Sequence, residues 1–174
     1  LEFRERMLEE YNRFWNEARR EKAAEVGLEP EEVIALASIV HKETAKPDER
    51  PRVAGLYLNR LRRNMALQAD PTVIYAIKRE TGNYDTIIKR VLYRDLELDS
   101  PYNTYKYGGI PPGPIFMPDI SAIEAVLNPE SHNYLYMVAD TENFGYHQFA
   151  ETLSQHNRNK EQYIRWINSM NIRR

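Results

Sequence analysis

The 174-residue sequence has no cysteine and lacks an excess of charge of one sign. Without cysteine the chain can form no disulfide and no thiolate nucleophile, and most structural zinc sites are excluded. Lysine and arginine (24) nearly balance aspartate and glutamate (26), so the sequence has no electrostatic footprint for nucleic acid. A local basic patch stays open, at Arg60, Arg62 and Arg63 or in the last two dozen residues, beside the alternative of a solvated helix face.

Long hydrophobic runs are also missing, so we expect no segment of this sequence to span a bilayer. The chain does not start with methionine, and nothing in it resembles a signal peptide. We therefore expect a fragment of a longer protein, with any membrane anchor outside it. The content of hydrophobic (42%) and charged (29%) residues is typical of one compact globular domain, with room for an extra arm.

The first 28 residues predict a helical connector ahead of a domain over residues 29–174. Apolar residues recur at helical spacing over residues 3–25, which predicts one long amphipathic helix that Gly27 ends. The residues that carry this periodicity are Phe3, Met7, Tyr11, Phe14, Trp15 and Ala18.

Two further helices are predicted from proline and acidic residues at their starts. Pro30 is well placed to open a helix that Pro47 closes, and Asp48 is expected to cap the next one, which runs to Leu61. The segment "QADPTVIYAIKRETG" repeats the pattern, with Asp70 as the cap and a helix that ends at a glycine.

The second half of the chain mixes loop, strand and helix signals. Within residues 84–99, "RVLYRDLEL" fits a short strand, and a helical turn ahead of it is the alternative. Residues 100–118, with five prolines, predict a long loop. After a short helix capped by Asp119 or Ser121, "NYLYMVAD" and "GYHQFA" predict a hairpin, and residues 154–170 predict a helix. The predicted fold class is α+β, mainly helical with a small antiparallel hairpin.

Glu43 is the first candidate for chemistry. It follows Leu36, Ile39 and Val40 by seven, four and three residues, so it extends the apolar face of its helix. Partial burial and the negative end of the helix dipole would both raise its pKa, as a general acid near neutral pH requires. Position alone leaves open a glutamate at a frayed helix end that reaches solvent or pairs with Lys42 or Arg52.

Other polar residues give weaker signals. If Asp70 caps its helix, its carboxylate is occupied by backbone amides, whereas Gln68 just before it can point into a cleft. The tyrosine-rich loop "SPYNTYKYGGIPPGPI" offers the aromatic faces and amides that grip sugars, or it packs on its own tyrosines. The four histidines have no metal-ligand spacing, and no phosphate-binding or nucleophile-elbow motif occurs, so neither a metal nor a cofactor is expected.

Eight short segments, taken together, resemble a known family. They occur in the order found in the endolytic murein transglycosylases of the YceG-like family, bacterial enzymes that cut nascent peptidoglycan strands. The segments, which extend from about Glu31 to the C-terminal helix, are "LASIVHKET", "NRL", "LQADPTVIY", "SPYNTY", "GIPPGPI", "YLYMVAD", "HQF" and "HN". The resemblance implies an α+β catalytic domain, without the membrane helix and small glycan-binding module that the family carries.

The resemblance also implies a site. The family's catalytic glutamate falls on Glu43, and His41 stands where the family has another acid. The implied chemistry uses Glu43 alone, first as acid and then as base, to cleave the β-1,4 bond between N-acetylmuramic acid and N-acetylglucosamine without water, leaving a 1,6-anhydro end. The residues that the resemblance places in the cleft as substrate-binding candidates are Gln68, Asp70, Thr72, Tyr102, Asn103, Thr104, Tyr105, His147 and Asn157.

Two alternatives stay open at this point: a non-catalytic glycan-binding or scaffold module, and a muramidase that uses water. The expected partners are peptidoglycan strands and peptidoglycan synthases, and no nucleic acid. By resemblance the full-length protein is anchored in the inner membrane, with this domain on the periplasmic side.

Overall fold

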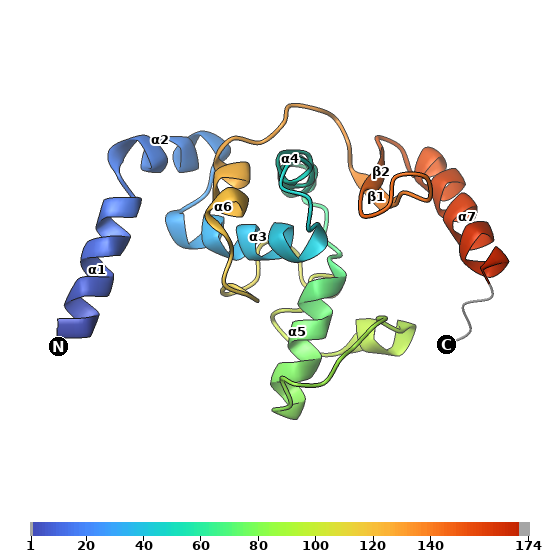
Figure 1. Cartoon of the computed structure of the whole chain (residues 1–174), viewed down its shortest axis with the longest axis horizontal. Helices are drawn as coiled ribbons and strands as arrows, with labels where there is room; N and C mark the ends of the chain where they lie inside the picture. The colour runs from blue at the N-terminus through green and yellow to red at the C-terminus, as the bar shows by residue number, and fades with distance from the viewer. Residues whose placement is uncertain (1, 171–174) are drawn as a thin grey trace.

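The computed structural model describes residues 2–170 and confirms the α+β class, with seven α-helices and a two-stranded antiparallel sheet in that range. The elements are α1 (Glu2–Phe14), α2 (Glu17–Val26), α3 (Pro30–Glu43), α4 (Arg50–Arg62), α5 (Asp70–Thr81), the 3-10 helix η1 (Tyr93–Glu97), α6 (Ile120–Leu127), β1 (Tyr136–Ala139), β2 (His147–Ala150) and α7 (Leu153–Ser169). Helix α1 lies at one edge of the molecule, and the hairpin with α7 lies at the opposite edge (Figure 1).

The predicted single helix over residues 3–25 is wrong, because the chain breaks into α1 and α2. Asn16 has an extended backbone, and its side-chain oxygen accepts a hydrogen bond from the amide of Arg19 at 3.0 Å. Asparagine is a poor residue inside a helix and a strong N-cap, so it starts a new helix here. Gly27 ends α2 in the left-handed conformation, with φ of 78°, as predicted.

Helices α3, α4 and α6 form the centre of the molecule and pack against one another (Figure 1). Leu36, Ile39 and Val40 on α3 have no exposed surface. Burying each side chain of this size contributes about 1.5–3 kcal/mol, so the apolar face of α3 fixes this helix firmly. Trp15 and Ala23 belong to the same hydrophobic cluster, while the predicted boundary at residue 28 stays a prediction.

The junction between α3 and α4 differs from the prediction. Helix α3 ends at Glu43, before Pro47 is reached, and Glu49 rather than Asp48 occupies the N-cap position of α4. The Asp48 carboxylate instead accepts a hydrogen bond from the hydroxyl of Tyr146 at 3.0 Å. The short connection turns the chain back, so that the C-terminal end of α3 lies beside the first turns of α4.

The segment between α5 and α6 contains little regular structure. The strand that "RVLYRDLEL" allowed is not formed, and the 3-10 helix η1 lies within that segment rather than ahead of it. The proline-rich residues 100–118 form the predicted loop. Asp119 takes the N-cap position of α6 but makes no side-chain cap bond. Its carboxylate accepts from Arg50 at 3.2 Å, and Ser121 accepts from the same guanidinium, which is buried.

The predicted hairpin and C-terminal helix are confirmed. Strands β1 and β2 pair antiparallel, with Met137 opposite Phe149. Helix α7 begins after Thr152, whose hydroxyl accepts from the amide of Gln155 at 3.2 Å, and packs on both strands.

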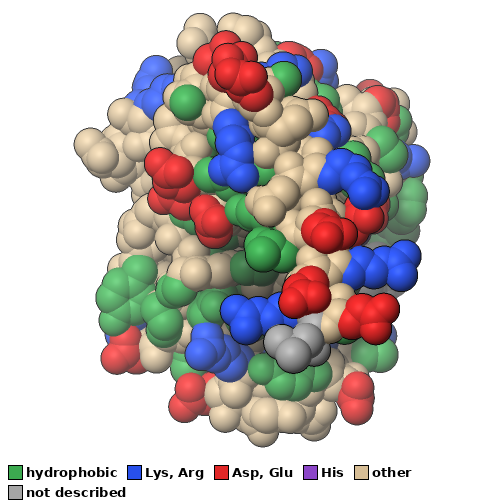
Figure 2. All heavy atoms as spheres, turned by 90° about the vertical axis from the view of Figure 1, so that its left-hand side faces the viewer, with side chains coloured by type: hydrophobic (Ala, Val, Ile, Leu, Met, Phe, Trp, Pro, Cys, Tyr) green, Lys and Arg blue, Asp and Glu red, His purple; other side chains and the backbone are tan. Residues whose placement is uncertain are grey.

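The surface over α1 and α2 intersperses basic, acidic and hydrophobic side chains, with no broad area of one charge on this face (Figure 2). Within residues 2–170 no helix combines the length and the apolar character needed to cross a membrane.

Candidate active site

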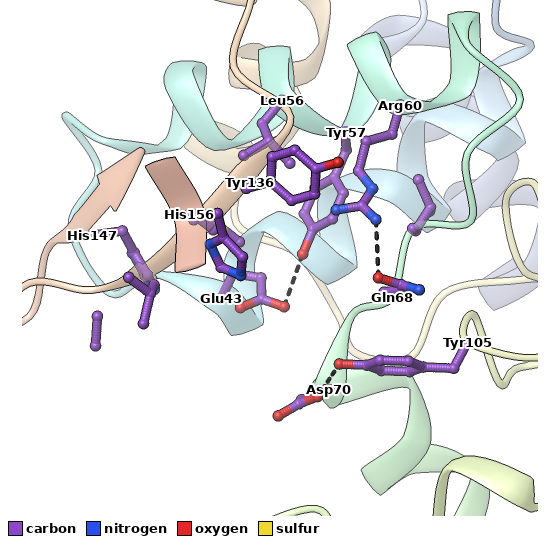
Figure 3. Close-up of a pocket in the computed structure, with 14 residues that line it drawn as sticks. Glu43, Leu56, Tyr57, Arg60, Gln68, Asp70, Tyr105, Tyr136, His147 and His156 are labelled. Atoms are coloured by element: carbon purple, nitrogen blue, oxygen red, sulfur yellow. Dashed lines mark hydrogen bonds between the residues drawn. The ribbon is translucent and has the colours of Figure 1, made fainter. Parts of the chain in front are cut away.

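Glu43 is the last residue of α3 and lies half-buried in a pocket of about 270 Å³. The hydroxyl of Tyr57 on α4 donates a hydrogen bond to Glu43 Oε1 at 2.9 Å (Figure 3). We call this cavity the Glu43 pocket. It is lined by Glu43, Leu56, Tyr57, Arg60, Leu67, Gln68, Asp70, Tyr105, Tyr136, Met137, Val138, Ala139, His147 and His156.

The surroundings of Glu43 favour its protonated form. Burial raises its pKa to about 7, although the hydrogen bond from Tyr57 and the charge of His147 act to lower it. Burial also raises the pKa of Tyr57 well above the ordinary tyrosine value, so this hydroxyl keeps its proton and serves as a donor. A carboxyl group with a pKa near neutrality can both give and take a proton at physiological pH.

Arg60 organises the wall of the pocket. It lies one turn after Tyr57 on the same face of α4, and only 7% of its surface is exposed. Its guanidinium donates to the carbonyls of Ala66 and Leu135, both at 2.9 Å, and to Gln68 Oε1 at 3.0 Å (Figure 3). Arg60 is therefore neither part of a basic surface patch nor on a solvated helix face. Its hydrogen bonds join the α4–α5 connection to the chain just before β1.

Asp70 does not cap α5, which corrects the prediction. Ala69 holds the N-cap position, and the Asp70 carboxylate accepts a hydrogen bond from the Tyr105 hydroxyl at 2.6 Å. The reason is that Asp70 is already the first helical residue, so its side chain points away from the free amides and into the pocket. Gln68, Asp70 and Tyr105 therefore line the Glu43 pocket, as the resemblance implied.

Thr72 and Thr104 lie behind this wall rather than on it. The Thr104 hydroxyl accepts from the amide of Ala69 at 3.0 Å and lies 2.8 Å from the Thr72 hydroxyl, and both threonines are buried. The first of these bonds gives the amide of Ala69, just before α5, a buried hydrogen-bond partner. The predicted cleft position of these two residues is corrected to a framework role.

Tyr102 and Asn103 are likewise absent from the pocket wall. Asn103 is fully buried, and its amide donates to the carbonyls of Leu96 and Leu98, both at 2.9 Å. The Tyr102 ring packs against Tyr75 with 4.8 Å between ring centroids. Asn103 thus provides hydrogen-bond partners for backbone groups of a loop that has no regular secondary structure. This fixes the loop that carries Tyr105 into the pocket wall.

His147 lines the pocket from β2 and forms an ion pair with Glu49. Its Nδ1 lies 3.0 Å from Glu49 Oε2, and its amide donates to Glu49 Oε1 at 2.7 Å. Burial would lower the pKa of His147, but the hydrogen bond and the charge of Glu49 outweigh burial and raise it. When His147 is protonated, its charge favours the ionised form of Glu43 and so acts against the effect of burial.

Asn157 is exposed and does not line the pocket. Its neighbour His156 does, and the His156 ring stacks on Tyr136 with 5.2 Å between centroids. One residue along α7 is a rotation of about 100°, which turns Asn157 away from the wall that His156 lines.

His41 has a structural partner outside the pocket. Its Nδ1 accepts from the amide of Asp119 at 3.1 Å, and its ring packs on Phe116 at 4.9 Å between centroids. Burial lowers the pKa of His41, which favours the neutral ring that this bond needs. An imidazole thus joins the end of α3 to the start of α6 without adding a second acid to the site.

Among the polar and aromatic residues of the pocket wall, four were missed from the sequence: Tyr57, Arg60, Tyr136 and His156. The spacing of Tyr57 and Arg60 shows that they share a helix face, but only the turn between α3 and α4 shows that this face meets Glu43. Within residues 2–170 no three histidine, aspartate or glutamate side chains converge in a way that could hold a metal ion.

Comparison with known proteins agrees with this site. The sequence pattern of the YceG-like family matches residues 1–162. The chain is 42% identical over 132 residues to the endolytic murein transglycosylase of Bacillus subtilis, with 76% of this chain and 34% of that protein covered. It is 38% identical over 134 residues to the endolytic murein transglycosylase of Streptococcus pneumoniae D39, with 76% and 24% covered.

A solved structure extends the likeness to the fold. The crystal structure of a yceG-like protein from Listeria monocytogenes is 40% identical and superposes with a TM-score of 0.68, covering 80% of this chain and 43% of that one. The chain spans about a third or less of the length of the curated relatives it matches.

Proposed function

This chain belongs to the YceG-like family, and on that premise we propose that it cleaves peptidoglycan glycan strands as an endolytic murein transglycosylase, with Glu43 as its single general acid and base. The observation that carries the proposal is the half-buried carboxyl of Glu43, with a pKa of about 7, in a pocket lined by polar and aromatic side chains. The names of the relatives supply the class of substrate.

The first step is protonation of the leaving group. Protonated Glu43 gives its proton to the glycosidic oxygen between C1 of N-acetylmuramic acid and O4 of N-acetylglucosamine. The C1–O4 bond then breaks, and positive charge develops at C1. The 2-acetamido group of the muramyl residue stabilises this charge, in the place that a second carboxylate takes in a two-carboxylate glycosidase.

The second step closes the anhydro ring. The muramyl 6-hydroxyl attacks C1, and its proton passes to the Glu43 carboxylate, which restores the starting state. No water is consumed, and the product carries a 1,6-anhydro end. A pKa near neutrality suits both halves of the cycle, because Glu43 must lose and regain a proton at the same pH.

The hydrogen bond from Tyr57 gives Glu43 a fixed orientation. The buried hydroxyl occupies Oε1, so the proton to be transferred sits on Oε2. The remaining polar groups of the wall, Gln68, Asp70 and Tyr105, would bind hydroxyl and acetamido groups of the sugars, and the Tyr136 ring offers an apolar face.

We also propose that the full-length protein works at the outer face of the inner membrane, on nascent strands and beside peptidoglycan synthases. Endolytic cleavage there would terminate a growing strand. These proposals rest on the family, and the domain described here bears only on the cleavage step.

Identification of the products tests this proposal. Purified glycan strands are incubated with the protein and examined by mass spectrometry, and we expect 1,6-anhydro-muramyl ends. Strands that bind but stay intact would instead indicate a glycan-binding or scaffold module.

A muramidase that uses water is the second candidate, and one observation favours it. The Asp70 carboxylate lines the same pocket as Glu43, and a hydrolase needs such a second acid. Reducing ends that carry ¹⁸O from labelled water, and that disappear in Asp70→Asn, would identify hydrolysis. Anhydro ends that persist in Asp70→Asn would identify the transglycosylase.

A further inference from the structure

A second cavity of about 440 Å³ adjoins the Glu43 pocket. It shares four wall residues with that pocket and continues past them between the segment after α5 and helix α7. We call it the Arg90–Lys160 pocket, and it is lined by Asp70, Arg90, Val91, Leu92, Tyr93, Leu96, Tyr105, Val138, His156, Lys160, Tyr163 and Ile164. A ligand that occupies one cavity can therefore extend directly into the other.

The new part of the wall is cationic. Arg90 and Lys160 are both exposed, and neither forms an ion pair with another residue between positions 2 and 170. They come from two different segments, Arg90 from the chain before η1 and Lys160 from α7. The ligand that this arrangement recognises carries a negative charge.

The same wall is also apolar. Leu92, Leu96 and Ile164 contribute aliphatic surface to it, and Tyr93 and Tyr163 contribute rings. The Tyr93 side chain is 88% exposed, so its ring is available to a ligand. A neutral sugar needs neither the cations nor the aliphatic surface, so the expected ligand is an anionic group with small aliphatic parts.

His156 stands at the junction of the two cavities. Its Nδ1 is buried and has no hydrogen-bond partner among residues 2–170. Burial is the main cause that lowers the pKa of His156, and the charges of Lys160 and Arg60 add to it, so the ring is neutral and can accept or donate one bond. A polar group of a ligand at this junction would complete the set of hydrogen bonds.

We propose that the Arg90–Lys160 pocket binds the peptide stem of an N-acetylmuramic acid whose sugar lies in or next to the Glu43 pocket. This inference rests on the proposed function, because it takes peptidoglycan as the ligand. A stem is a short peptide with free carboxylates and alanyl methyl groups, joined to the sugar through its lactyl group. It is thus anionic, partly aliphatic and tethered to the sugar chain, which matches the charge, the surface and the position of this pocket.

Binding tests the proposal separately from catalysis. The inactive variant Glu43→Gln is titrated with fluorescent glycan oligomers of one length, either bearing their stems or denuded by an amidase. The readout is the ratio of the two dissociation constants. Replacing both cations, by Arg90→Glu and Lys160→Glu, should reduce the preference for stem-bearing oligomers by about tenfold, because two attractive contacts become repulsive.

The matched control is Arg165→Glu, which reverses an exposed arginine on the same helix that does not line either cavity. We expect it to leave the ratio unchanged, whereas the effect of the double variant should shrink as salt is added. An equal ratio in the double variant and its parent would overturn the proposal. A double variant that loses affinity for stem-bearing and denuded oligomers by the same factor would give this same result. Failure to form anhydro ends would refute the proposed function but would leave this binding result in place.

Discussion

Replacing Tyr57 by phenylalanine should raise the pKa of Glu43 and move the pH dependence of cleavage. The substitution removes the hydroxyl that donates to Glu43 Oε1 at 2.9 Å and keeps the buried ring. A hydrogen bond to a charged acceptor contributes about 1.5–3 kcal/mol, and one to a neutral acceptor about 0.5–1.5 kcal/mol. The carboxylate therefore loses about 1 kcal/mol more than the acid, which raises its pKa by roughly 0.7 of a pH unit.

The sign of this change can be measured directly. Glu43 must be protonated to act as an acid, so kcat/KM should fall as the pH rises through its pKa, which is about 7 in the native protein. In Tyr57→Phe this alkaline limb should lie at higher pH. The assay is the rate of anhydro-end release between about pH 5 and about pH 9.

Tyr75→Phe is the matched control, because Tyr75 does not line the Glu43 pocket. Its profile should coincide with that of the native protein. An alkaline limb that stays in place in Tyr57→Phe, or that moves to lower pH, would refute the role given to this hydroxyl.

Three further substitutions separate structural from catalytic roles. Gly55→Ala should lower the free energy of unfolding in urea by about 1–3 kcal/mol, because its Cβ would lie 2.5 Å from the carbonyl oxygen of Glu130; a stabilised variant would contradict this contact. His41→Ala should lower the free energy of unfolding by about 1 kcal/mol, because the hydrogen bond to the Asp119 amide is lost, and should leave kcat unchanged. A large loss of kcat at full stability would instead place His41 in the reaction. Thr104→Val should cost about 1–3 kcal/mol in the same assay by leaving a buried amide without a partner, and an inactive variant of native stability would argue against its framework role.

Local patterns predicted the features that depend on one helix or one hairpin. The position of Glu43 at the end of an apolar stripe follows from the periodicity of α3 alone. The hairpin follows from two alternating segments around a polar turn. In both cases the interacting residues are close in sequence, so no knowledge of the tertiary fold is needed.

The features that were missed depend on contacts between distant segments. Tyr57 meets Glu43 only because α4 folds back on α3, and Arg60 is buried only because the chain before β1 passes over it. Asp70 was expected to cap its own helix, but Thr104, 34 residues further along the chain, helps to satisfy the backbone there. The family resemblance placed Thr104 in the cleft, whereas the structure buries it behind the pocket wall.

The break at Asn16 is a different kind of error. Hydrophobic periodicity continues across it, so a count of apolar positions gives one helix. The preference of asparagine for the N-cap decides the outcome, and Trp15 then turns into the core.

The most direct test of the central claim is the product spectrum of Glu43→Gln. Glutamine has nearly the same shape and can still accept the hydrogen bond from Tyr57, so the fold should be retained, as circular dichroism and urea unfolding can check. It has no proton to give at neutral pH, so the proposed mechanism predicts that 1,6-anhydro-muramyl ends fall to the background of the reaction without protein. Release of anhydro ends at a rate near that of the native protein would contradict the assignment of Glu43 as the single general acid and base.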